Sequence, residues 1–123
     1  MLDVKDLRSA AERLAGRFRS MPQSRLRRGA AGEGLALARE LAAQAQRLEF
    51  PGGQVRLMPD EGVFAVGDQI AVAGHELAAA LERRPELSAV RDAALDRIEA
   101  VRDLEGFTFS AGQSEATTRS ARM

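Results

Sequence analysis

The residues best suited to chemistry in this chain are Asp68, His75 and Glu76, because His75 is the only histidine and carboxylates lie near it. Two helical turns separate Asp68 from His75, and Glu82 lies two turns further on, so these three side chains would share one helix face. A carboxylate beside an imidazole could act as a general acid–base pair or hold a small ligand. A single histidine on a helix is more often a surface or hydrogen-bonded residue, so we treat Asp68, His75 and Glu76 as weak polar-site candidates.

Other catalytic and cofactor-binding patterns are missing from the sequence. The residue three before His75 is Val72, so no Glu-x-x-His pair exists to build a di-metal site. The chain has no cysteine, which excludes thiolate metal sites, thiol nucleophiles and disulfides within it. Residues 29–34 read Gly-x-x-Gly-x-Gly, which is not a phosphate-binding order, and no serine lies in Gly-x-Ser-x-Gly. We therefore expect no catalytic residues, no cofactor, no metal and no enzymatic activity.

Arginines form the strongest charge asymmetry, with seven of them between residues 8 and 28 against the single acidic residue Glu12. Residues 1–48 hold ten basic and five acidic residues, a net charge of +5, and residues 49–123 hold eight and thirteen, a net of −5. A neutral chain without Trp or Tyr argues against a dedicated nucleic-acid binder. Arg25, Arg27 and Arg28 follow the break at Pro22, so binding of nucleic acid or another polyanion through these three stays as an alternative.

The elements that must position these side chains are helices, because apolar residues recur every three or four positions through most of the chain. The pattern predicts helices at about 2–21, 24–49, 61–84 and 86–105. Pro22, Pro51 and Pro85 mark the breaks between them. We expect Asp60 to cap the third helix and Gly106 to end the fourth.

The longest internal loop lies between the second and third helices. Val55, Leu57 and Met58 in this loop are expected to lie extended across the end of the bundle.

The predicted fold is all-α, an antiparallel four-helix bundle with up-down-up-down topology in one domain over residues 1–106. Residues 107–123, rich in Ser, Thr, Gly and Ala, are expected to form a flexible C-terminal tail. In this topology the first helix lies beside the fourth. Acidic residues of the fourth helix would then balance arginines of the first.

A row of small residues, Gly67, Ala71, Gly74 and Ala78, follows one face of the third predicted helix. Their missing side chains would let another backbone approach closely. Two interpretations stay open: close packing against a helix of the same chain, or a face for self-association or a partner. We therefore take these residues, with Arg25, Arg27 and Arg28, as the candidate interaction surface.

The sequence also restricts location and function class. The N-terminal residues do not form a signal peptide and no run of 18 apolar residues occurs, so we expect a cytoplasmic protein with no membrane partner. Arginine is used almost to the exclusion of lysine, which is typical of a GC-rich bacterial genome. Small size and helical content are similar to type VII secretion proteins, but their Trp-x-Gly turn and Tyr-containing signal are missing, so we assign no family.

Our leading hypothesis is a small non-enzymatic helical-bundle protein that acts through protein–protein interaction, with a homodimer as one form. Arginine-mediated binding of a polyanion is the first alternative. An enzyme or small-ligand binder centred on Asp68, His75 and Glu76 is the second.

Overall fold

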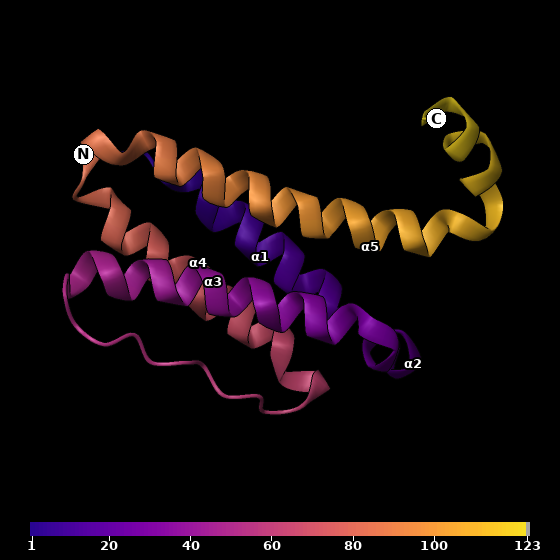
Figure 1. The fold of residues 1–123 in the computed structure, drawn as a ribbon, viewed down its shortest axis with the longest axis horizontal. Coiled ribbons are helices and arrows are strands. Elements are labelled where there is room, and N and C mark those ends of the chain that lie inside the picture. The colour runs from indigo at the N-terminus through magenta and orange to yellow at the C-terminus, as the bar shows by residue number, and fades with distance from the viewer. Residues whose placement is uncertain (123) are drawn as a thin grey trace.

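The computed structural model describes the backbone of residues 1–122 and the side chains of residues 1–105. Within residues 1–122 every regular element is helical, which confirms the all-α prediction, and four long helices pack together (Figure 1). The elements in chain order are α1 (Lys5–Arg19), α2 (Gln23–Arg25), a π-helical turn η1 (Leu26–Ala30), α3 (Ala31–Glu49), a 3₁₀ turn η2 (Val63–Ala65), α4 (Val66–Glu82), a second 3₁₀ turn η3 (Pro85–Leu87) and α5 (Ser88–Arg122).

Helix α1 forms where its apolar stripe predicts it. Leu7, Ala11, Leu14 and Phe18, spaced three or four residues apart, are all buried. The helix begins later and ends earlier than 2–21. Leu2 precedes it in an irregular segment, where its N–H donates to the carbonyl of Glu82 at 3.0 Å and ties the N-terminus to the end of α4.

The helix predicted at 24–49 is in fact divided at Gly29. This residue has a φ of +136°, a conformation that residues with a Cβ rarely adopt. The short helix α2 and the turn η1 therefore precede the kink, and the regular helix α3 starts only at Ala31. A glycine at this position lets the chain change direction without a loop.

The start of α4 also differs from the prediction. Asp60 does not cap it: the N-cap position is Ala65, and Asp60 Oδ1 instead accepts a hydrogen bond from the N–H of Gly62 at 2.9 Å. Gly62 has a φ of +98°. The chain therefore turns tightly at residues 60–62, and helical structure begins at Val63.

Helices α3 and α4 run parallel, so the up-down-up-down prediction is wrong. Near their first turns, a Cβ on Gly34 would meet the side chain of Val66; at their last turns, Arg84 Nη2 donates to the carbonyl of Leu48 at 2.8 Å. The observed order is up-down-down-up, with residues 50–62 as a crossover along the outside of the bundle (Figure 1).

The length of the crossover explains why this topology is available. Helix α4 has 17 residues and is about 26 Å long at 1.5 Å per residue. An extended chain advances about 3.3 Å per residue, so residues 50–62 can span about 40 Å. The segment can therefore return along the whole bundle, and it does not cross the bundle end as we predicted.

The core lies mainly between α1, α3 and α4. Its largest fully buried side chains from these helices are Leu7, Leu14, Leu37, Leu41, Ile70, Leu77 and Leu81. Helix α5 adds Ala94, Ile98 and Val101 from its inner face. It runs beside α3, where Arg97 bonds Glu40 through two nitrogens at 2.8 and 3.0 Å.

The fourth predicted helix does not end at Gly106, because α5 continues to Arg122. One glycine costs a helix only about 1 kcal/mol, and no proline follows it to force an end. The predicted flexibility of residues 107–123 lies outside the part of the chain whose side chains the structure describes.

Candidate functional site

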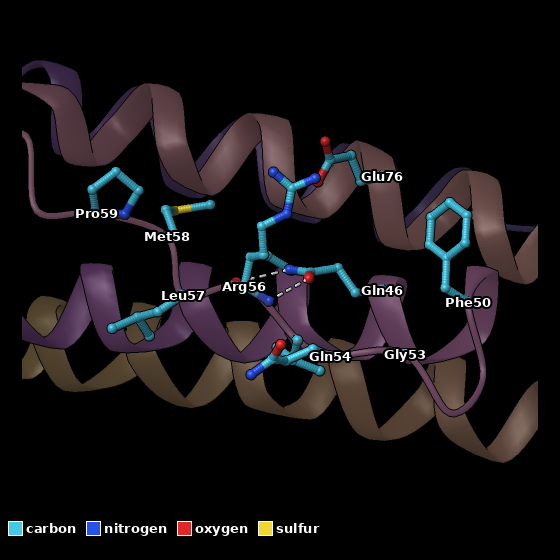
Figure 2. Close-up of a pocket in the computed structure, with 11 residues that line it drawn as sticks. Gln46, Phe50, Gly53, Gln54, Arg56, Leu57, Met58, Pro59 and Glu76 are labelled. Carbon is cyan, nitrogen blue, oxygen red and sulfur yellow. Dashed lines mark hydrogen bonds between the residues drawn. The ribbon is translucent and has the colours of Figure 1, made fainter.

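The crossover segment is held on α3 by a side chain that imitates a neighbouring strand. Gln46 Nε2 donates to the carbonyl of Arg56 at 3.0 Å, and Gln46 Oε1 accepts from the N–H of Arg56 at 2.7 Å (Figure 2). One amide side chain therefore satisfies both backbone groups of Arg56. A β-ladder partner would make the same two bonds.

Two further side chains fix the rest of the segment. Arg39 Nε donates to the carbonyl of Met58 at 2.8 Å, and Gln69 Nε2 donates to the carbonyl of Pro59 at 2.9 Å. The first comes from α3 and the second from α4. A stretch without helix or turn is thus anchored at three successive points, and its shape is set by the helices beneath it.

The anchored segment and the two helices enclose an open groove of about 670 Å³. Phe50, Val55 and Leu57 line it, although they are 71%, 39% and 71% exposed. Val72, one helical turn before the groove residue Glu76, is 53% exposed on α4. We call these four apolar residues, together with the backbone of residues 54–58, the crossover face.

Charge enters the groove from two sides. Arg56 extends from the crossover toward Glu76 on α4, and both side chains line the groove (Figure 2). The groove therefore carries no net charge of its own. The groove is thus an apolar surface with a polar centre, formed by Arg56 and Glu76, whose charges cancel.

The predicted row at Asp68, His75 and Glu82 is used to join two helices. Arg19 Nε donates to Asp68 Oδ1 at 2.8 Å, and His75 Nε2 lies 2.6 Å from Glu12 Oε2. Glu82 is 3.6 Å from a nitrogen of Arg8, whose other terminal nitrogen is 3.4 Å from His75 Nδ1. Each member of the row thus faces α1.

Glu76 does not join this row, because it faces the groove on the other side of α4. The three weak polar-site candidates therefore do not converge. Among the residues that the structure describes, no group of three His, Cys, Asp or Glu side chains could hold a metal ion.

These contacts also correct our explanation of the arginine-rich α1. The ion pairs of Arg8 and Arg19 reach acidic residues of α4, not of α5. Arg13 and Arg17 do line a hollow shared with α5, where Glu99 lies. The ion pairs of α1 therefore reach mainly α4, the third long helix.

The candidate cluster Arg25, Arg27 and Arg28 precedes the kink at Gly29 and is divided between two hollows. Arg25 and Arg28 line a hollow that also holds Glu33 and Glu105, whereas Arg27 lines a separate one. Burial raises the pKa of the Glu105 carboxyl above its ordinary value, and the nearby charge of Arg25 opposes this shift. The hollow thus pairs two cations with two carboxylates and does not concentrate positive charge.

The small-residue row is covered by α1. Gly67, Ala71, Gly74 and Ala78 are all buried in the single chain. A Cβ on Gly67 would lie 2.9 Å from the carbonyl oxygen of Ala15, and one on Gly74 would overlap the methyl group of Ala11. Of the two interpretations left open by the sequence, the structure shows close packing within the chain.

The crossover face is the feature that sequence reasoning missed. Its signal was present as Val55 and Leu57 alternating with the polar Gln54 and Arg56, the period of an extended strand. Gln46 gave no such signal. Its bond to Arg56, ten residues further on, depends on how the following loop returns across α3.

Comparison with protein-family models gives no match, and comparisons with curated proteins and with solved structures give no significant match. No helix in the part of the chain that the structure describes is long and apolar enough to cross a membrane.

Proposed function

We propose that this chain is a small non-enzymatic protein-interaction module whose docking surface is the crossover face. The observation that carries the proposal is that Phe50 and Leu57 are each 71% exposed although they line a groove whose backbone is anchored. Because the backbone that carries these side chains is already anchored, it loses little conformational freedom when a partner covers them. Such preorganisation favours binding.

The size of the surface fits a protein partner. The exposed fractions of Phe50, Val55, Leu57 and Val72 add up to roughly 400 Å² of surface, spread along the groove between Phe50 and Leu57 (Figure 2); the largest apolar patch on a typical monomer covers ~300–600 Å². Such patches often mark functional contacts. An open groove of this kind suits side chains from another protein better than an enclosed small molecule.

The proposal is tested by site-specific photo-crosslinking in the native cell. A photoreactive residue at position 57 is expected to crosslink the chain to protein, whereas the same residue at position 13, exposed on α1, is the matched control. A crosslink to protein at 57 and none at 13 supports the proposal. Equal crosslinking at both positions contradicts it.

A second measurement, of copurifying nucleic acid, distinguishes the proposed protein docking from the polyanion alternative. Nucleic acid that copurifies with the chain, and is lost when Arg25, Arg27 and Arg28 become alanine, would favour that alternative instead. Protein crosslinks at position 57 should be unaffected by those three substitutions.

A further inference from the structure

We infer that the crossover face docks a second copy of this chain by antiparallel pairing of residues 54–58. This inference rests on the proposed function and names its partner. Its starting point is the direction of the backbone groups in the anchored segment.

In an extended chain the N–H and C=O of one residue point to one side, and those of the next residue point to the other. Both groups of Arg56 point to Gln46 on α3. The groups of Val55 and Leu57 must therefore point away from α3. Among the described residues none makes a hydrogen bond to the N–H or C=O of Val55 or Leu57.

This open edge is closed at both ends. The N–H of Gly53 is already used, because it donates to the carbonyl of Phe50 at 2.9 Å. Pro59 has no N–H, and its carbonyl accepts from Gln69. Among the described residues of this edge only Val55 and Leu57 keep a free N–H, so the edge offers two donors and cannot extend into a longer ladder.

An edge of this form is complementary to itself. With a two-fold axis at Arg56, Val55 lies opposite Leu57 of the second copy, and Leu57 lies opposite its Val55. Both are hydrogen-bonded pairs of an antiparallel ladder, which gives four bonds in total. Each pair also brings two apolar side chains together, which stabilises a ladder.

The two-fold axis also places Arg56 opposite Arg56, and like charges in direct opposition are unfavourable. Glu76 offsets this, because each Arg56 extends toward a Glu76 of its own chain (Figure 2). Two cations and two anions then lie around the centre. The formal net charge of the chain is zero, so no long-range repulsion keeps two copies apart.

The apolar area is adequate for such a dimer. A standard interface takes about 800 Å² from each partner, of which somewhat more than half is apolar. The roughly 400 Å² that Phe50, Val55, Leu57 and Val72 expose is close to that share. The backbone pairing supplies register, and the apolar side chains supply most of the affinity.

Light scattering after size-exclusion chromatography tests the inference first. The chain is expected to be a dimer at micromolar concentration. Leu57→Pro removes an N–H that the single chain does not use and should raise the dimer Kd about 30-fold, the effect of two lost hydrogen bonds. The melting temperature should be unchanged when both chains are compared as dilute monomers. A strict monomer up to about 1 mM, or a Leu57→Pro chain that dimerises normally, would overturn the inference.

Disulfide trapping then tests the register, since the chain has no cysteine of its own. Arg56→Cys places two thiols across a non-hydrogen-bonded pair with Cα atoms about 4.5 Å apart, within the range of a disulfide. Gln54→Cys is the control, because its Cα atoms would lie about 14 Å apart. Oxidation should crosslink only the Arg56→Cys chain. Equal crosslinking of both chains, or of neither, rejects the pairing.

The two proposals can fail separately. A monomeric chain whose position 57 still crosslinks to a different protein keeps the proposed function and rejects the second copy as the partner. A chain with neither property rejects both.

Discussion

Replacing Gln46 should release the crossover segment from α3. Gln46→Leu keeps a side chain of similar size but removes both hydrogen bonds to Arg56, at 2.7 and 3.0 Å. At about 0.5–1.5 kcal/mol each, and with partial exposure, these bonds contribute about 1–2 kcal/mol to the free energy of unfolding. Urea denaturation should show a loss of this size.

Amide hydrogen exchange supplies the second measurement for this substitution. The N–H of Arg56 is held by Gln46 Oε1, so it should exchange slowly in the unmodified chain and rapidly in Gln46→Leu. Gln44→Leu on the same helix is the matched control, since Gln44 makes no side-chain hydrogen bond among the described residues. Unchanged exchange at Arg56 in the Gln46→Leu chain would show that the Gln46–Arg56 hydrogen bonds do not hold the crossover segment. It would also remove the basis for an open edge held in place at Val55 and Leu57.

Three further predictions concern the scaffold. Gly74→Ala should lower the free energy of unfolding, measured in urea, by about 1–3 kcal/mol, because the added methyl group would overlap α1. Gly16→Ala is the control: it has open space around it and should raise the free energy of unfolding by about 0.5–1 kcal/mol. Equal effects of the two substitutions would contradict the close packing of α4 on α1. Because burial raises the pKa of Glu105, the folded chain holds its proton more tightly, so stability should fall as pH rises through the raised pKa, and Glu105→Gln should remove that part of the pH profile measured by thermal melts. Arg97→Ala should lower the free energy of unfolding by about 0.5–1 kcal/mol, because it removes the bidentate contact with Glu40 that joins α5 to α3. Arg102→Ala, which removes a bond to the adjacent residue Asp103, should cause no measurable change in the same melts. A larger loss for Arg102→Ala than for Arg97→Ala would be inconsistent with these contacts.

Local helical structure could be predicted because it depends on spacing within one segment. The stripe from Leu7 to Phe18 defines α1 and its buried face, and Pro22 marks its end. The break inside the second predicted helix had a weaker signal. Three glycines at 29, 32 and 34 made its start uncertain, but only the backbone angle of Gly29 identifies the kink.

Helix direction could not be predicted, because residues 50–62 are long enough either to turn at the bundle end or to return along it. The contacts that fix the choice, such as Arg84 with the carbonyl of Leu48, join residues far apart in sequence. The anchored edge depends on that direction. Gln46 meets Arg56 only because the crossover runs back along α3.

Side chains of α3 anchor residues 54–58 in an extended conformation, and we infer that the open edge of this segment docks a second chain. Amide exchange at residues 55, 56 and 57, measured by NMR at low and high protein concentration, tests this docking. We expect slow exchange at Arg56 throughout, and slow exchange at Val55 and Leu57 only at high concentration. Rapid exchange at Val55 and Leu57 at every concentration would contradict it, as would protection of either residue in the dilute monomer.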